Sequence, residues 1–261
     1  MFDALLFNPL YNALIFFIDV LPYADVGFAV ILLTLLVKLV LFPLSLKAVK
    51  TNLLMRQIEP EVKKVREKYK DKQEQALKMM ALYKEQGVNP FSSILLLLIQ
   101  LPIVIALYFV FLKGGLPDIQ VERLYSFIPV PETVHIEFLG LVDLASRSIV
   151  LAILAGATQY FQIKLSLPPQ GPRSENATMQ EDFARSLQTN MRYMLPVIVV
   201  FVAAIMPAAV PLYWLTSNVF AIGQELYVRR HIKPTLAQPE SVEEEESTSV
   251  AQPQKKKKKK K

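Results

Sequence analysis

One charged side chain interrupts a long apolar stretch of this chain. Residues 26–46 read VGFAVILLTLLVKLVLFPLSL, and Lys38 lies past the middle of that run. About 20 apolar residues are enough to cross the hydrocarbon core of a membrane. A charge near the centre of such a helix costs roughly 2.5–3.5 kcal/mol on insertion scales, so Lys38 is expected to face water or a polar partner. Thr34 lies one turn earlier on the same helical face, and the two predict a polar stripe.

A blander interpretation of Lys38 remains open. Lysines in membrane helices often extend their aliphatic stem toward the nearest interface. Lys38 is about eight residues, or about 12 Å, from the end of the span. Its stem covers only about half of that distance, so full extension requires a thinned bilayer or a wet cavity. We favour a functional polar cavity, and we keep extension to the interface or a structural ion pair as the alternative.

Other polar residues fall inside apolar stretches and are candidates to line the same cavity. They are Gln100 in the second stretch, Gln159 and Gln162 in the third, and Trp214, Ser217 and Asn218 in the last. Trp214 is equally well explained as a residue of the interfacial aromatic belt. The polar residues cluster in parts of the spans, which indicates a cavity open on one side of the membrane and argues against a conducting pore.

The sequence offers no catalytic constellation. It has no cysteine, which excludes disulfides, cysteine nucleophiles and Cys-ligated zinc. His135 and His231 lie in segments expected on opposite sides of the membrane, so a serine–histidine pair or a two-histidine metal site is not expected. No glycine-rich phosphate loop occurs. We therefore expect a protein that is not an enzyme and that uses no cofactor or metal.

Composition and patterning predict an all-α integral membrane protein. Hydrophobic residues make up 52% of the 261-residue chain, and the segment after residue 46 is charged with a thin apolar seam at helical spacing. The predicted parts are an outer interfacial amphipathic helix (1–25), a first span (26–46), a cytoplasmic helical hairpin (47–90), a second span (93–112), an outer loop (113–147), a third span (148–165), a cytoplasmic loop (166–192), a fourth span (193–207), a fifth span (210–228) and a disordered cytoplasmic tail with a polylysine end (229–261).

Charge distribution predicts the orientation. With five spans, 25 of the 29 lysine and arginine residues fall on one side of the membrane and 3 on the other. The positive-inside rule then places the N-terminus outside and the C-terminus in the cytoplasm of a bacterial plasma (inner) membrane. The N-terminus has no basic region followed by a small-residue cleavage site, so no cleaved secretory signal is expected.

Several segments, in order, resemble the YidC/Oxa1/Alb3 family of membrane protein insertases. They are TLLVKLVLFPLSLKAVK, KYKDKQEQALKMMALYKEQGVNPF, LIQLPIVIALY, FLGLVDLA, TQYFQIKLS and MRYMLPVIVVFVAAIMPAAVPLYWLTSN. The resemblance covers most of residues 7–230 and is of the short type that lacks a large outer domain. It implies a core of five transmembrane helices with a hydrophilic groove that is open to the cytoplasm and to lipid and closed outside.

The resemblance also assigns residues. Lys38 matches a position that is arginine in most bacterial members, so the charge is kept and the bidentate fork is lost. Gln162 and Trp214 match further groove positions, and Gln159 is a less certain match. The family's Pro-Ala-Gly-Leu before the last helix is Pro207-Ala208-Ala209-Val210 here.

The implied function is insertion and folding of nascent membrane proteins, which are released sideways into the lipid bilayer. In the hairpin, Met79 and Met80 offer an adaptable first substrate contact. The basic tail resembles ribosome-binding tails, with anionic lipid as its alternative target; its residues are Lys255, Lys256, Lys257, Lys258, Lys259, Lys260 and Lys261. A Sec translocon is a possible partner and DNA is not an expected one. The competing function is a small-solute transporter or channel subunit, which requires a polar path to the outer face.

Overall fold

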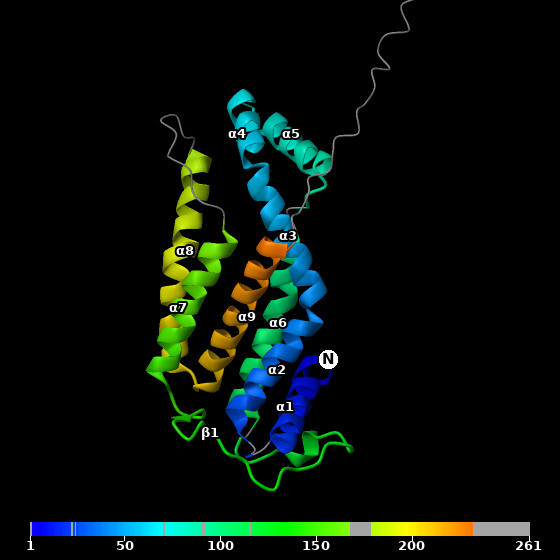
Figure 1. Cartoon of the computed structure of the whole chain (residues 1–261), viewed down its shortest axis with the longest axis vertical. Helices are drawn as coiled ribbons and strands as arrows, with labels where there is room; N and C mark the ends of the chain where they lie inside the picture. Colours follow the sequence, from blue (N-terminus) through cyan, green and yellow to red (C-terminus); the bar gives the residue numbers. More distant parts are fainter. Residues whose placement is uncertain are drawn as a thin grey trace, which may run out of the picture.

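Long helices running in one general direction form the body of the protein, with a helical hairpin at one end and an irregular loop at the other (Figure 1). The structure, a computed structural model, describes residues 2–21, 23, 25–69, 71–89, 92–114, 116–167 and 179–231. The elements are η1 (Asp3–Phe7), α1 (Asn8–Val20), α2 (Val26–Val40), α3 (Phe42–Gln57), α4 (Glu59–Lys68), α5 (Lys72–Glu85), α6 (Ser92–Lys113), η3 (Val121–Arg123), β1 (Glu137–Phe138), β2 (Val142–Asp143), α7 (Ile149–Ser166), α8 (Met179–Ile205) and α9 (Ala209–His231).

Several of these helices have the length and composition of membrane spans. Among the described residues, Asp3–Val20 and Ile149–Ser166 each qualify alone, and the bent pair α2–α3 qualifies as one broken span. Shorter apolar helices cover Pro102–Lys113 and Thr189–Ile205. Large apolar side chains stand exposed along α8, and Phe201 is 72% exposed. Such a surface suits contact with lipid tails, because soluble proteins rarely expose extended apolar patches.

The structure divides the predicted first span of residues 26–46. α2 ends at Val40, α3 begins at Phe42, and the two helices are bent by 66° at Leu41. Pro43 lies in the first turn of α3, where its missing N–H costs least and its ring starts a new helix direction. The bend comes three residues after Lys38. α3 then continues to Gln57, so the charged hairpin proper is α4 and α5.

α7 and α8 lie side by side and approach each other closely at a glycine (Figure 1). A Cβ built on Gly156 would lie 2.2 Å from Val200 Cγ2 and 3.1 Å from the Pro196 carbonyl oxygen. The absent side chain is therefore what lets the two backbones pack, as small residues do in membrane helix pairs. α8 extends well before the predicted fourth span of residues 193–207, because it begins at Met179.

The end of the bundle opposite the hairpin holds the main apolar core. Buried side chains from α1, α2, α6 and α9 meet there, among them Tyr11, Ile15, Leu33 and Leu107. A short β1–β2 hairpin, not predicted from the sequence, covers this end, with Leu139 and Gly140 at positive φ in its turn. Three residues, 139–141, connect the paired Phe138 and Val142, and Leu141 N donates to the Phe138 carbonyl at 3.0 Å, so Leu139 and Gly140 are the two central residues of a tight turn.

α1 packs against this core, and hydrogen bonds from the middle of α1 tie it to the segment between α6 and β1. The Tyr11 hydroxyl donates to the Gly114 carbonyl (3.0 Å), and Asn12 Nδ2 donates to the Arg123 carbonyl (3.0 Å). Tyr125 N in turn donates to Asn12 Oδ1 (2.7 Å). These contacts place the middle of α1 level with the C-terminal end of α6.

The hairpin has a small core of its own. Ile58, Val62 and Val88 are buried, and Met79 packs against them. Asp71 caps α5 by accepting from Glu74 N at 3.2 Å. α4 and α5 contact each other, so the predicted helical hairpin at 47–90 corresponds to two antiparallel helices carried at the end of α3 (Figure 1).

Candidate functional site

Lys38 lies on α2 and is partly buried. Within the described part of the chain, no carboxylate pairs with its ammonium group. Thr34, one turn before, is 1% exposed, and its hydroxyl donates to the Val30 carbonyl of the same helix at 2.7 Å. Thr34 thus donates its hydroxyl hydrogen within its own helix, whereas the Lys38 ammonium group donates to no acceptor among the described residues.

A second set of predicted residues is brought together where α9 crosses α7. Asn218 is 6% exposed, and its Nδ2 donates to the Ala155 carbonyl (3.2 Å) and to Thr158 Oγ1 (3.3 Å). Ser217, beside it, is 4% exposed. Because a buried amide costs free energy unless it is hydrogen-bonded, Asn218 also fixes the register of the two helices.

Polar side chains continue along α7 toward its C-terminal end at Ser166. Gln159 Nε2 donates to Gln162 Oε1 (3.2 Å), and Gln162 Nε2 donates to Ser166 Oγ (3.1 Å). All three are partly exposed. We call Thr158, Gln159, Gln162, Ser166 and Asn218 the polar ladder. No hydrogen bond among the described residues joins Lys38 to this ladder.

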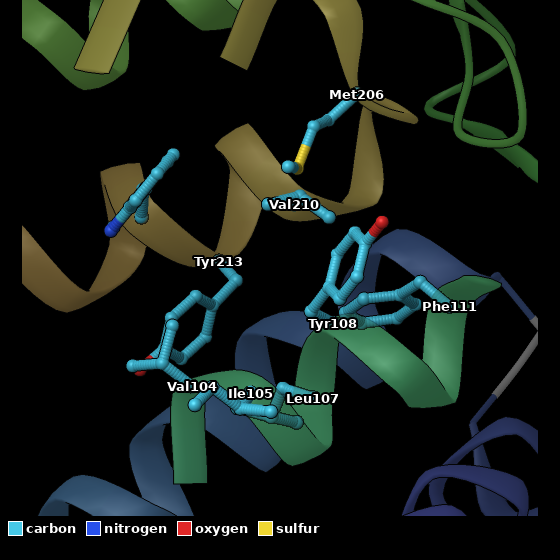
Figure 2. Close-up of a pocket in the computed structure, with 9 residues that line it drawn as sticks. Val104, Ile105, Leu107, Tyr108, Phe111, Met206, Val210 and Tyr213 are labelled. Carbon is cyan, nitrogen blue, oxygen red and sulfur yellow. The ribbon is translucent and has the colours of Figure 1, made fainter. Parts of the chain in front are cut away.

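Trp214 has an apolar environment. It lines a cavity of about 170 Å³ between α6 and the start of α9, together with Met206 and residues of α6. Figure 2 shows Tyr108 and Phe111 of α6 facing Met206 and Val210 across this space. Gln100 lies in helix α6, but its side chain is outside the described part of the structure. The structure therefore groups Trp214 with α6, and not with Gln159 and Gln162.

Two contacts fix α3 against α9 beyond the bend. Ser45 Oγ and the Gln224 side-chain amide exchange hydrogen bonds of 3.1 and 2.8 Å, and Phe42 meets Phe220 edge to face. Sequence reasoning missed this pair, because the partners are 179 residues apart. The pair holds the helix that carries the hairpin against the same helix that carries Asn218.

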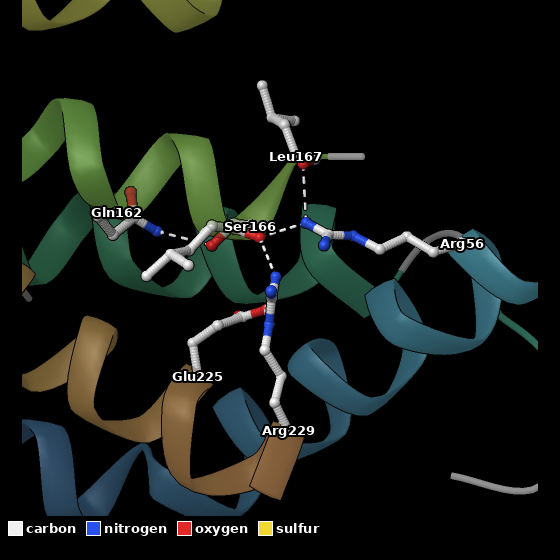
Figure 3. A network of polar contacts seen from close by, with 7 residues as sticks. Arg56, Gln162, Ser166, Leu167, Glu225 and Arg229 are labelled. Atoms are coloured by element: carbon white, nitrogen blue, oxygen red, sulfur yellow. Dashed lines mark hydrogen bonds and ion pairs between the residues drawn. The ribbon is translucent and has the colours of Figure 1, made fainter. Parts of the chain in front are cut away.

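Sequence reasoning also missed an arginine network at the C-terminal end of α7 (Figure 3). Arg56 of α3 and Arg229 of α9 both donate to the Leu165 carbonyl at the end of α7. Arg229 also forms an ion pair with Glu225 at 3.0 Å. The four-residue spacing of Glu225 and Arg229 on one helix was a readable signal for the pair, whereas nothing local marks Arg56.

The two hairpin methionines differ in accessibility. Met79 contributes to the hairpin core, whereas Met80 is 48% exposed and lines a surface depression with Tyr83 and Val88. Burial raises the pKa of the Tyr83 hydroxyl above its usual value. The tail lysines Lys255–Lys261 lie outside the described residues.

Hydrogen bonds tie together the end of the bundle opposite the hairpin. The Asp25 side chain accepts from Gly27 N and Phe28 N at the start of α2 and from Leu139 N of the β1–β2 turn. At the α8–α9 connection, Ala208 N and Ala209 N donate to carbonyls of Ser146 and Leu144. No cluster of three or more metal-ligating side chains occurs within the described ranges.

Comparison with known proteins gives one consistent result. Residues 17–235 match the family described as 60Kd inner membrane protein. The chain is 36% identical over 210 residues to a membrane protein insertase YidC of Clostridium tetani, covering 80% of this chain and 84% of that relative. It is 35% identical over 210 residues to the insertase YidC of Francisella tularensis subsp. novicida, of which it spans only 33%.

A solved structure has the same fold. The crystal structure of an active YidC insertase with its first transmembrane domain resolved superposes with a TM-score of 0.56 at 24% sequence identity. The match covers 87% of this chain and 46% of that one. The predicted all-α insertase core is thereby confirmed.

Proposed function

This chain belongs to the 60-kDa inner membrane protein (YidC) family of membrane protein insertases, and we propose that it carries out insertion through a polar groove that leads from the cytoplasm to Lys38. The observation that carries the proposal is a half-buried lysine inside an apolar helix, with no carboxylate partner among the described residues. Placing a charged side chain inside an apolar helix costs free energy, so we expect Lys38 to have a functional role. A transient carboxylate on a passing substrate is the natural partner.

The polar ladder supports the rest of the path. Gln159, Gln162 and Ser166 hydrogen-bond to each other along α7 and remain partly exposed, so their remaining donors and acceptors can serve polar groups of a substrate. In bare lipid those groups would have no partner. A groove of this kind shortens the distance that a polar segment crosses unsolvated, and no ATP or metal is needed.

Lateral release is supported by the apolar cavity between α6 and α9. It is lined by Tyr108, Phe111, Met206 and Trp214, among others, and offers space for one large apolar side chain. A substrate helix that leaves the groove here gains the free energy of transferring its apolar surface into lipid. The exposed Met80 on the hairpin serves as the first contact with such a substrate.

The proposed orientation places the outer loop outside and the hairpin in the cytoplasm. The contacts from the middle of α1 to Gly114, Arg123 and Tyr125 favour an α1 that lies at the outer interface, as the sequence predicts for 1–25. The N-terminus is then outside and the C-terminus inside. Nascent membrane proteins are the proposed substrates, the ribosome is the proposed partner of Lys255–Lys261, and a Sec translocon is a further proposed partner.

The test is insertion of a short single-spanning substrate with an acidic N-terminal tail into proteoliposomes that contain only this protein. Protease protection of the tail is measured for wild type, Lys38→Arg, Lys38→Gln and Lys38→Glu. Lys47, exposed on the cytoplasmic side, gives the matched charge-reversal control Lys47→Glu. We expect protection with wild type, Lys38→Arg and Lys47→Glu, and at least about a tenfold loss with Lys38→Glu, equal to about 1.4 kcal/mol.

Full protection with Lys38→Glu would remove the groove charge from the mechanism. The competing transporter or channel function is checked in the same vesicles by solute flux. That function needs a polar path through the outer layer, where the described core side chains of α1, α2 and α6 are mainly apolar.

A further inference from the structure

The turn of the β1–β2 hairpin presents two leucines at its surface. Leu139 is 57% exposed and Leu141 is 82% exposed, one on each side of Gly140. Tight turns are usually made by glycine, asparagine or aspartate, which suit water and tolerate a positive φ. Two large apolar side chains at the tip of a hairpin instead bury little of their surface within the chain.

Leu139 also has an unfavourable backbone conformation. Its φ of 56° lies in the left-handed region, where the Cβ of an L-residue crowds the following carbonyl oxygen. Glycine or asparagine would form this turn at a lower conformational cost. A leucine that is strained and mostly exposed stabilises neither the turn nor the core, and local strain of this kind points to a contact outside the chain.

The turn is held firmly against the start of α2. Leu139 N donates to Asp25 Oδ2 at 3.1 Å. Phe138 packs directly over Gly27, where a Cβ built on the glycine would lie 2.1 Å from Phe138 Cδ2. The two leucines therefore have a fixed position beside the first turn of α2.

The two faces of the hairpin differ in polarity. Phe138 and Val142 are cross-strand partners, and the Phe138 ring meets Phe28 of α2 edge to face at 5.4 Å. Glu137 and Asp143 are the next pair, and neighbouring pairs along a strand point to opposite faces. Carboxylates that lie directly opposite each other repel, and water screens this repulsion. We therefore expect the face with the two carboxylates to contact solvent.

The leucines adjoin apolar surface that the long helices expose. Phe28, which contacts Phe138, is itself partly exposed. α7 begins at Ile149, shortly after β2 ends at Asp143, and its first two residues, Ile149 and Val150, are both exposed. Figure 1 shows β1 at the end of the bundle where α2 and α7 begin. A hairpin tip at this level reaches the boundary between lipid head groups and acyl chains.

We propose that Leu139 and Leu141 insert into the lipid leaflet at this end of the bundle, which is the outer leaflet in the proposed orientation. Transfer of the two leucine side chains from water into lipid offsets the conformational cost of Leu139. Glu137 and Asp143 stay in water and limit how deeply the tip inserts. The contact fixes the start of α2, the helix that carries Lys38, relative to the bilayer.

The sequence contains no cysteine, so single cysteines can be labelled specifically in the full-length protein. Leu141→Cys places a label at the tip. Glu137→Cys is the matched control, because Glu137 is exposed on the solvent face of the same hairpin. Each variant is reconstituted as a single protein in a lipid nanodisc, and a nitroxide label reports collisions with oxygen, which concentrates in lipid, and with a water-soluble nickel chelate.

We expect the label on Leu141→Cys to favour oxygen and to lie about 5–10 Å inside the boundary between head groups and acyl chains. The label on Glu137→Cys should favour the nickel chelate. Adding Leu139→Asn, which suits a positive φ, should shift the label on Leu141→Cys toward water. A single symmetric elution peak before reconstitution shows that each variant is folded.

A second readout excludes insertion driven by the label itself. The unlabelled thiol of Leu141→Cys should react with a water-soluble maleimide at least about tenfold more slowly than that of Glu137→Cys, because an apolar environment disfavours the reactive thiolate. Nanodiscs leave both sides of the bilayer open to reagents, so neither readout depends on the orientation or on the role of Lys38.

Three results would overturn the proposal. Preference of the label on Leu141→Cys for the nickel chelate, or equal thiol rates at the two positions, would place the tip in water. Low collision rates with both reagents would mean that the tip packs against protein and not lipid. An unchanged label depth after adding Leu139→Asn would remove Leu139 from the contact with lipid.

Discussion

Substitution of Asp25 tests how the end of the bundle opposite the hairpin is held together, because the two carboxylate oxygens of Asp25 accept different hydrogen bonds. Oδ1 accepts from Gly27 N (2.7 Å) and Phe28 N (3.2 Å) and so caps α2. Oδ2 accepts from Leu139 N (3.1 Å) and so holds the β1–β2 turn. The residue is 7% exposed, which leaves water little access to replace either set of bonds.

Two substitutions separate these roles. Asp25→Asn keeps an oxygen for the cap but presents an NH₂ group to Leu139 N, so it should lose about 1–2 kcal/mol of unfolding free energy. Asp25→Ala loses the cap as well, which is worth about 1–2 kcal/mol more, for a total of about 2–4 kcal/mol. The expected order of stability is therefore wild type, Asn, Ala.

The assay is reversible unfolding of the purified protein in mixed micelles, combined with hydrogen exchange of residues 135–143. Asp19 is exposed near the same end, and Asp19→Asn removes the same charge as a control with little expected effect. Exchange at Leu139 should rise in both Asp25 variants. Equal stability of Asp25→Asn and Asp25→Ala, or unchanged exchange at Leu139, would refute the division of labour between the two oxygens.

Two more predictions concern α7–α8 packing and the outer loop. Gly156→Ala should destabilise the protein by about 1–3 kcal/mol in the same unfolding assay, because the new Cβ meets Val200 Cγ2. Adding Val200→Ala to this variant should restore part of the lost stability. Additive losses in the double variant would contradict the close contact between the two residues. The hydroxyl of Ser146 and then the Ala145 amide hold the pKa of Asp143 below its usual value. The Asp143 carboxylate therefore stabilises the folded loop at pH values above its unfolded pKa, and this contribution is lost as the pH falls through the lowered folded pKa. Ser146→Ala should raise the pKa of Asp143 in an NMR titration. An unchanged pKa would exclude the hydroxyl as the cause of the shift.

The sequence predicted the helical class and the location of most helices because these depend on local composition. Apolar runs and the charged segment with helical spacing are readable without knowing any partner. The bend at Leu41 had a local signal too, since Pro43 is visible in the sequence, but a proline tells where a helix can break and not by how much. The turn at Leu139 had no such signal, because leucine rarely adopts a positive φ.

The candidate site was less accessible to sequence reasoning. The contact between Asn218 and Thr158 depends on how two helices cross, whereas the sequence shows only that both residues are polar and lie within apolar runs. The position of Trp214 beside α6 depends on the rotation of α9 in the same way. The arginine network was missed for a similar reason, because Arg56 meets Leu165 across 109 residues.

The bend between α2 and α3 makes α3 a lever arm. α3 has 16 residues, so it reaches about 24 Å from the bend to the start of the hairpin. A rotation of about 10° at Leu41 would move the hairpin by about 4 Å, because the arm length multiplies the angle. The bend lies three residues from Lys38, and the hydrogen-bonded pair of Ser45 and Gln224 restrains α3 close to the bend. Any displacement of the hairpin would therefore turn α3 about a point three residues from the partly buried Lys38.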